Sequence, residues 1–275
     1  MFLDKLLGAS RRNQSLLCVG LDPDPRLAPP SLVGEPGWVA RFARGIIDAT
    51  ADLVCAYKPN LAFYEALGAE GWDALRETVK AVPDGIPVIA DAKRGDIGNT
   101  AQAYAAALYD GLGADAATVS PYLGQDSVAP FLAYRGRTAF VLCKTSNPGS
   151  GDFQDLVCQF EGRELPLYQV VAQRAVGWGA EGEVGLVVGA TYPRELAAIR
   201  AIAPRAPLLL PGVGAQAGDL ESAVRLGVDA DGERAIVNAS RQVLYASRGE
   251  DWQVAARAAA LALRDAINQA RSLPR

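Results

Sequence analysis

Short apolar runs and longer stretches of helical periodicity alternate along the whole chain. Apolar runs of about four to eight residues that end at turn residues are typical of buried strands, and apolar residues three and four apart are typical of helices. Eight such runs predict strands, at residues 15–21, 53–57, from 86 onward, 114–120, 138–143, 183–188, 207–210 and 235–238.

The stretches between these runs predict helices, at residues 38–51, 63–79, 99–112, 125–134, 165–178, 193–202, 218–226 and 252–272, with one more at the N-terminus and a polar insertion at 148–164. Eight strands alternating with helices predict an α/β fold with a parallel sheet closed into a (β/α)8 TIM barrel. An open doubly wound sheet would favour GxGxxG after the first strand, and Gly20-Leu21-Asp22 does not supply it. Without any linker-like break, residues 1–275 are expected to form a single barrel domain with an N-terminal helix.

Composition narrows the class of partner. The chain has 275 residues, 50% of them hydrophobic, and a formal net charge of -4. It has no basic run for nucleic acid, so a small molecule is the expected partner. No apolar run reaches the roughly 18 residues of a membrane span, and the N-terminus lacks a secretory pattern. With four cysteines, no CxxC and no histidine, we expect a cytoplasmic protein that uses neither a histidine base nor a common zinc site.

Charged residues gather where the third apolar run ends. Side chains alternate between the two faces of a strand, so Asp91 and Lys93 project to the same side. The chain has only five lysines among 27 basic residues, and Lys58, Lys93 and Lys144 stand at the ends of strand-like runs. A structural ion pair is one interpretation. Arg is the usual residue for such a pair, however, and Lys is the one that can exchange a proton. We therefore expect an active site at the carboxyl ends of the strands.

A phosphate site is expected at the last two strands. The segment 211–214, Pro-Gly-Val-Gly, can bring backbone N–H groups close to an anion, although a plain turn is the alternative. Ser240 and Arg241 follow the eighth strand and add a hydroxyl and a planar cation. Loops seven and eight are the usual phosphate-binding loops of this barrel, so the sequence predicts a phosphate ester as substrate.

These motifs together carry a family resemblance. Residues 91–97, Asp-Ala-Lys-Arg-Gly-Asp-Ile, resemble the D-x-K-x-x-D-I signature of orotidine 5'-phosphate decarboxylases. Lys-Pro-Asn at 58–60 and Lys-Thr-Ser-Asn-Pro at 144–148 extend the similarity to the longer-chain bacterial (type 2) branch over essentially the whole length. The resemblance implies decarboxylation of orotidine 5'-phosphate to UMP in pyrimidine biosynthesis, without cofactor or metal, by a homodimer with shared active sites.

The resemblance also implies roles for individual residues. Asp91 and Lys93 correspond to the pair beside the scissile carboxylate, and Asp96 to a residue contributed across the dimer interface. The remaining implied ligands are Lys58 in the charge array and at the ribose, Asp22 at the ribose, Ser146 at the pyrimidine, Pro211, Gln216, Ser240 and Arg241 at the phosphate, and Ile97 and Thr100 beside the cross-subunit contact. Ser240 stands where compact members often carry Gly.

The proposed chemistry follows from the substrate. Loss of carbon dioxide from a vinylic carbon leaves an electron pair that nothing in the ring delocalises, so a fixed cation such as Lys93 must stabilise it and then deliver a proton. Asp91 keeps that lysine charged and oriented. The loop 214–218 is the candidate for closure over the phosphate. Two alternatives stay open: a magnesium-dependent sugar-phosphate lyase of the same superfamily, and a non-catalytic nucleotide-binding barrel.

Overall fold

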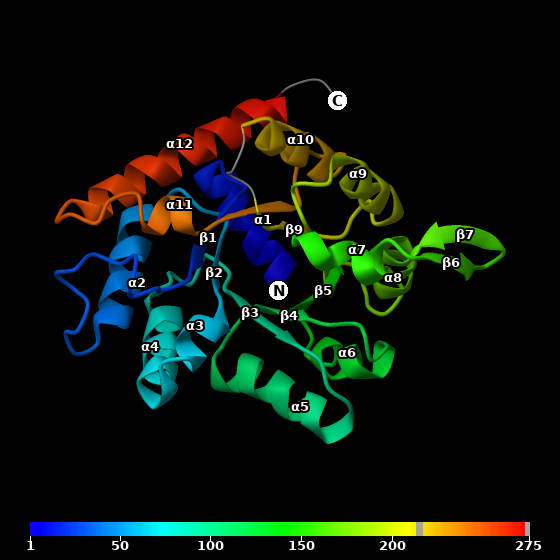
Figure 1. Cartoon of the computed structure of the whole chain (residues 1–275), viewed down its shortest axis with the longest axis horizontal. Coiled ribbons are helices and arrows are strands. Elements are labelled where there is room, and N and C mark those ends of the chain that lie inside the picture. Colours follow the sequence, from blue (N-terminus) through cyan, green and yellow to red (C-terminus); the bar gives the residue numbers. More distant parts are fainter. Residues whose placement is uncertain (213–216, 273–275) are drawn as a thin grey trace.

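The computed structural model describes residues 1–212 and 217–272, and its centre is an eight-stranded parallel sheet (Figure 1). Neighbouring strands follow the order β2-β1-β10-β9-β8-β5-β4-β3. Parallel bridges from Tyr57 to Val88 and from Asn60 to Asp91 join the two ends of this order and close the barrel. The strands are β1 (Leu17–Leu21), β2 (Ala56–Pro59), β3 (Ile89–Arg94), β4 (Ala116–Val119), β5 (Thr138–Lys144), β8 (Val184–Val188), β9 (Leu208–Leu210) and β10 (Ala235–Ala239). The predicted TIM barrel is confirmed.

Helices form a ring around the strands, as the alternation of patterns predicts (Figure 1). The longer helices are α1 (Phe2–Asn13), α2 (Trp38–Thr50), α4 (Gly68–Ala81), α5 (Gly98–Ala106), α6 (Gln125–Leu132), α8 (Leu167–Val176), α9 (Pro193–Ile202), α10 (Ala217–Gly227) and α12 (Trp252–Ser272). Short helical segments are α3 (Leu61–Glu65), η1 (Ala107–Gly111), η2 (Pro148–Ser150), α7 (Gly151–Gln154) and α11 (Arg241–Leu244). None of the described helices is both long and apolar enough to cross a bilayer.

The structure departs from the predicted pattern in three places. Leu53 and Val54 are buried in the turn after α2, so their apolar character reflects packing rather than strand pairing, and β2 starts later. The single helix expected at 63–79 is divided into α3 and α4 at Gly68, whose φ of 66° favours glycine.

The third departure is in the polar insertion, which contains an antiparallel hairpin, β6 (Val157–Phe160) and β7 (Arg163–Pro166). Its two-residue turn, Glu161-Gly162, has positive φ at both positions, the geometry that hairpins of this length prefer. The hairpin projects outward beyond α8 (Figure 1).

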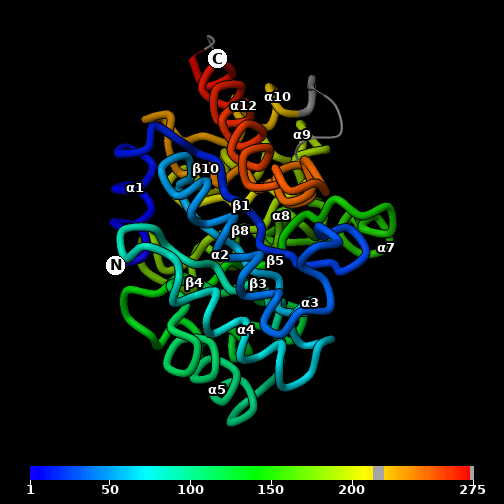
Figure 2. The backbone as a smooth tube through the Cα atoms, turned by 90° about the vertical axis from the view of Figure 1, so that its left-hand side faces the viewer, coloured from blue at the N-terminus to red at the C-terminus, as the bar shows by residue number. Residues whose placement is uncertain are grey.

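Helix α1 closes one end of the barrel. Phe2 and Leu6 belong to the apolar cluster inside the strands, together with Cys18, Ile236 and Phe140. The rings of Phe2 and Phe140 meet edge to face, with centroids 5.6 Å apart. Figure 2 shows α1 at one end of the barrel and α7 at the other. The filled end is at the amino termini of the strands, which leaves the carboxyl end for the polar residues.

Candidate active site

The carboxyl end of the barrel holds a lysine–aspartate–lysine array. Lys58 Nζ lies 2.8 Å from Asp91 Oδ2, and Lys93 Nζ lies 2.6 Å from Asp91 Oδ1. The Thr118 hydroxyl donates to the same Oδ1 at 2.9 Å. The side chains of Lys58 and Asp91 are 4% and 9% exposed, whereas that of Lys93 is 49% exposed. Asp91 is therefore fixed on both oxygens, and Lys93 is the member of the array that faces open space.

Mutual attraction keeps Asp91 and Lys58 ionised despite their burial. Burial alone would raise the pKa of Asp91, but the charges of Lys58 and Lys93 and their hydrogen bonds outweigh it, so this pKa lies well below its usual value. Burial likewise opposes the charge of Lys58, yet attraction to Asp91 and Asp22 raises the pKa of Lys58 above its usual value. At neutral pH both groups therefore carry charge although their side chains are almost fully buried.

The backbone at Lys93 has an unusual conformation that is held in place by neighbouring groups. Lys93 has a φ of 47°, in the left-handed region that non-glycine residues seldom occupy. The pairing of β3 with β4 shifts register between Ala90 and Arg94, so the chain bends at this point. The backbone N–H of Lys93 donates to Thr118 Oγ1 at 2.9 Å, which holds the bend. Such local strain is typical of functional sites.

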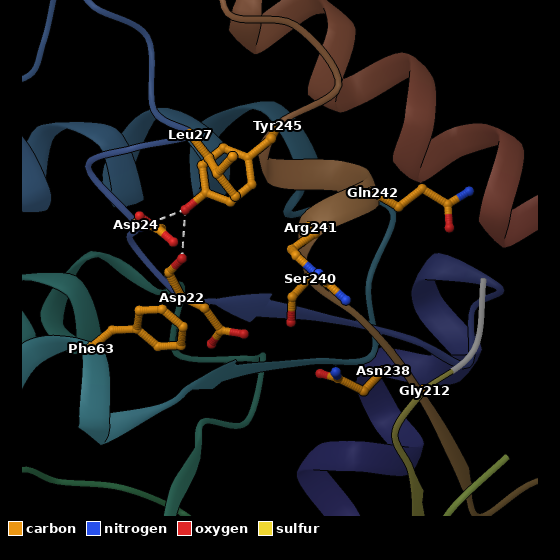
Figure 3. A pocket seen from close by; sticks show the side chains of 10 residues that line it. All are labelled: Asp22, Asp24, Leu27, Phe63, Gly212, Asn238, Ser240, Arg241, Gln242 and Tyr245. Atoms are coloured by element: carbon orange, nitrogen blue, oxygen red, sulfur yellow. Dashed lines mark hydrogen bonds between the residues drawn. The ribbon is translucent and has the colours of Figure 1, made fainter. Parts of the chain in front are cut away.

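A cavity of about 600 Å³ lies beside the array. Three of the predicted ligands, Asp22, Ser240 and Arg241, line it, and Asn238, Gly212 and Tyr245 are among the other lining residues. Figure 3 shows Asp22, Asn238 and Ser240 pointing toward a common space from β1 and β10. Asp22 connects the cavity to the array, because its Oδ1 accepts from the N–H of Asn60, which is bridged to Asp91.

Glycines allow the strand ends to approach one another at two points. A Cβ atom at Gly20 would lie 1.9 Å from Ser240 Oγ, so the Ser240 side chain occupies the space over β1 that any other residue would fill. A Cβ at Gly189 would lie 2.9 Å from the backbone nitrogen of Ser146, and one at Gly212 would lie 3.4 Å from Ser146 Oγ. Ser146 is thereby placed against the loop that begins with Pro211.

The signature continues to the rim of the barrel. Asp96 Oδ1 accepts from the backbone N–H of Ile97 at 2.8 Å, and within the described part of the chain no ion pair joins Asp96 to Lys93. Ile97 is 55% exposed, and Thr100 is exposed on α5. Among the described residues, no hydrogen bond or ion pair thus joins the side chains of these three residues to the array of their own chain. Gln216 and most of the predicted closing loop, 214–218, lie outside the described residues.

Lys144, the third lysine at a strand end, belongs to a different cluster. Its Nζ lies 2.7 and 2.8 Å from the two oxygens of Asp155 and 3.3 Å from Ser150 Oγ. The Nζ also lies 4.7 Å from the centre of the Tyr192 ring. Next to it, the backbone N–H of Thr145 donates to Gln154 Oε1 at 2.9 Å. Lys144 therefore ties the insertion to the end of β5.

Sequence reasoning missed two residues that position the site. Thr118 holds both Asp91 and the backbone of Lys93. Tyr245 donates its hydroxyl to the carbonyl of Asp22 at 2.6 Å and accepts from the N–H of Asp24 at 2.6 Å. Burial raises the pKa of Tyr245 to about 12, so it stays a neutral donor. A threonine in an apolar run and a tyrosine in a short helix carry no distinctive signal by themselves.

A closed parallel barrel with a charged array and a cavity at the carboxyl ends of its strands is the architecture of a β/α-barrel enzyme. A model of the orotidine 5'-phosphate decarboxylase / HUMPS family matches residues 15–258, and the chain belongs to this family.

Known relatives agree over the full length. The chain is 56% identical to orotidine 5'-phosphate decarboxylase of Roseiflexus castenholzii and 52% identical to that of Cupriavidus metallidurans, covering 98% of this chain and of each relative. The solved structure of Leishmania donovani OMP decarboxylase superposes with a TM-score of 0.85 at 44% identity and 99% coverage of both chains. The family resemblance noted from the motifs is confirmed.

Proposed function

We infer that this chain decarboxylates orotidine 5'-phosphate to UMP, a step of pyrimidine biosynthesis, with Lys93 and Asp91 at the reacting carbon. The observation that carries the assignment of residues is the array itself: one buried carboxylate is shared by a buried lysine and a half-exposed one. The family and the full-length relatives support the reaction.

Lys93 is the group that handles the developing charge. The vinylic carbanion left by carbon dioxide has no conjugated carbonyl or imine to delocalise it, so a fixed ammonium beside that carbon lowers the barrier. The ammonium then delivers a proton to the same carbon. Because Asp91 and Thr118 hold Lys93 before substrate arrives, little reorganisation is needed.

Asp91 has two effects on the reaction. Its charge orients Lys93, whose Nζ lies 2.6 Å from Asp91 Oδ1. It also repels the substrate carboxylate, by about 4 kcal/mol for unit charges roughly 4 Å apart at an effective dielectric near 20. We give the first effect the greater weight, since Asp91 is already neutralised by two lysines.

The other end of the site binds the part of the substrate that does not react. Asp22 faces the cavity beside Lys58 and is suited to the ribose hydroxyls. Arg241 and Ser240 line the same cavity and are suited to the phosphate, with Pro211 and Gln216 as further ligands. Ser146, packed against Gly212, is suited to the pyrimidine. Binding energy from the phosphate can then hold the carboxylate against Asp91.

A homodimer with shared sites explains why, among the described residues, Asp96 makes no ion pair with the lysines of its own array. Asp96 would complete the array of a neighbouring subunit, with Ile97 and Thr100 beside it. Support comes from exposed apolar side chains at this rim: Ile97 is 55%, Tyr122 84% and Leu123 48% exposed, and they follow the adjacent strands β3 and β4. Apolar side chains of this size gather at protein interfaces.

We also propose that residues 1–275 act as one barrel domain, and that the reaction takes place in the cytoplasm. All four cysteines are free, and Cys18, Cys55 and Cys143 are buried. This agrees with a reducing compartment.

The decisive experiment follows the orotate absorbance band of orotidine 5'-phosphate when the purified protein is added in the presence of EDTA. Loss of the band supports the decarboxylase. A magnesium-dependent lyase would be silenced by EDTA, and a nucleotide-binding barrel would bind UMP while the band persists. Within residues 1–212 and 217–272, no group of three His, Cys, Asp or Glu side chains is arranged to hold a metal ion.

The shared site is tested by mixing two inactive proteins, Lys93→Ala and Asp96→Ala. Hybrid dimers would contain one site with both residues intact, so part of the activity should return. If mass spectrometry shows subunit exchange and no activity returns, the shared site is wrong.

A further inference from the structure

Asn238 is a buried side chain whose hydrogen-bonding capacity is unused. It is 8% exposed, and its Oδ1 has no hydrogen-bond partner among the described residues. Within residues 1–212 and 217–272 the side-chain amide of Asn238 makes no other hydrogen bond either, although Asn238 lines the cavity. Buried amides are nearly always paired, so an unpaired one that faces a cavity needs a ligand to explain it.

The position of Asn238 on β10 fixes its depth in the barrel. Side chains two apart on a strand share a face, and Ile236 belongs to the apolar cluster in the interior. Asn238 therefore faces inward directly above that cluster, beside Cys18 of β1, with which it is in register. Ser240 lies two residues nearer the mouth, so Asn238 is roughly 6 to 7 Å deeper along the strand.

Depth indicates which part of the substrate Asn238 meets. Under the proposed function, on which this inference rests, Ser240 and Arg241 hold the phosphate at the mouth and Asp22 faces the ribose. The portion that reaches deeper is the base. A pyrimidine edge offers a carbonyl acceptor beside an N–H donor, and a carboxamide offers the complementary donor and acceptor. We propose that Asn238 is a further specificity-determining residue, whose side-chain amide hydrogen-bonds to the pyrimidine base.

The proposal predicts opposite effects on stability and on binding. In the free protein, burial of the Asn238 amide costs free energy of desolvation that no hydrogen bond to a described residue offsets. Replacement by Leu, of similar size, should therefore raise the melting temperature. The same replacement should weaken UMP binding, because the base loses its partner. A residue that serves only the fold would not gain stability while losing ligand.

The experiment measures Kd by calorimetry for UMP and for ribose 5-phosphate, which lacks the base, together with kcat and KM. Asn238→Leu should raise Kd for UMP about tenfold, the effect of one or two hydrogen bonds, and leave Kd for ribose 5-phosphate unchanged. KM should rise with little change in kcat, since the contact is present in substrate and transition state alike.

Ser10 supplies a matched control. Its Oγ is also buried with no hydrogen-bond partner in the part of the chain that the structure describes, but Ser10 lies on α1 at the closed end of the barrel. Ser10→Ala should leave both dissociation constants unchanged. If Asn238→Leu does not fold, Asn238→Ala is compared in the same way.

Two outcomes would overturn the proposal: unchanged affinity of the variant for UMP, or an equal loss for UMP and ribose 5-phosphate, which would place the contact at the ribose or phosphate. Turnover of orotidine 5'-phosphate by the unsubstituted protein is measured first. If that turnover is absent, the proposed function fails; if it is present and the variant binds UMP normally, only the role of Asn238 fails.

Discussion

Two buried lysines lie at the carboxyl ends of β2 and β5 in the same barrel, yet their surroundings differ. Lys58 and Lys144 have side chains only 4% and 1% exposed, and each pairs with an aspartate. The partner of Lys58, Asp91, is itself buried and is shared with Lys93, whose side chain is 49% exposed. The partner of Lys144, Asp155, is 50% exposed and lies just after α7 in the insertion.

The difference separates a reactive array from a structural clamp. A buried carboxylate between two lysines fixes charge inside the barrel and leaves one cation free to face substrate. A half-exposed carboxylate on a loop instead anchors that loop to a strand. Since Ser146 lies two residues after Lys144, we expect this clamp, Lys144 with Asp155, to position Ser146. Under the proposed function, the same pair of residue types at two strand ends thus serves chemistry in one place and loop geometry in the other.

Lys93→Ala should give the largest effect. It removes the cation that stabilises the carbanion and the proton donor, so kcat should fall by many orders of magnitude. UMP has no carboxylate to place near Lys93, so its dissociation constant should change little. Calorimetry with UMP and turnover assays on the same preparation check both. Near-normal turnover would show that Lys93 does not take part in the reaction, and the proposed difference between the array and the clamp would then be wrong.

Asp91→Asn should destabilise the protein in a pH-dependent way. It leaves the buried Lys58 without its hydrogen-bonded counter-charge, so that only the charge of Asp22 still favours the ammonium, at a cost of about 3 kcal/mol. Because the pKa of Asp91 is lowered in the folded protein, its stabilising contribution is present above the unfolded value of about 4 and is lost as pH falls below it. The difference in melting temperature between the two proteins should therefore be large at pH 7 and shrink at about pH 3. A constant difference across this range would show that Asp91 is not held ionised by the lysines.

The array could be predicted largely from sequence, whereas its supports could not. The alternation of a strand places Asp91 and Lys93 on one face, and the apolar runs predict the barrel that turns this face inward. Thr118 was missed because its importance depends on which strand lies beside β3. Gly20 was missed because its constraint comes from Ser240, more than two hundred residues away in the chain.

The clamp formed by Lys144 and Asp155 could not be predicted from sequence periodicity, for a related reason. Lys144 stood out as one of few lysines, but its partner lies in an insertion with neither helical nor strand periodicity. Asp155 is placed next to Lys144 by the short helix α7. With four residues, this helix is too short to show a helical periodicity in the sequence. In the sequence, Asn238 is likewise only the polar residue at the end of a strand. That its Oδ1 has no hydrogen-bond partner among the described residues is known only from the folded structure.

Asp155→Asn should destabilise the protein more than the 50% exposure of the Asp155 side chain implies. The amide can still accept a hydrogen bond, but it leaves the fully buried Lys144 without a full counter-charge. The other described contacts of Lys144 Nζ are Ser150 Oγ and the Tyr192 ring. We expect a loss of about 2 kcal/mol in the free energy of unfolding. Denaturant titration measures it. A neutral result would mean that Ser150 and Tyr192 alone suffice for Lys144.

Lys144→Met should give the smallest effect on stability and is the sharpest test of the clamp. Met fills the space of the lysine stem, and the half-exposed Asp155 that it leaves behind can be solvated, so the loss should be about 0 to 1 kcal/mol. The insertion would no longer be tied to β5, however, and Ser146 would be held less firmly. We expect KM for orotidine 5'-phosphate to rise about threefold, or about 0.7 kcal/mol, with kcat nearly unchanged.

Ser10→Ala, at the closed end of the barrel, provides the kinetic baseline. A fall in kcat comparable to that of Lys93→Ala would place Lys144 in the chemistry and abolish the contrast between the two lysines. Unchanged KM would show that Ser146 is positioned by Gly189 and Gly212 alone.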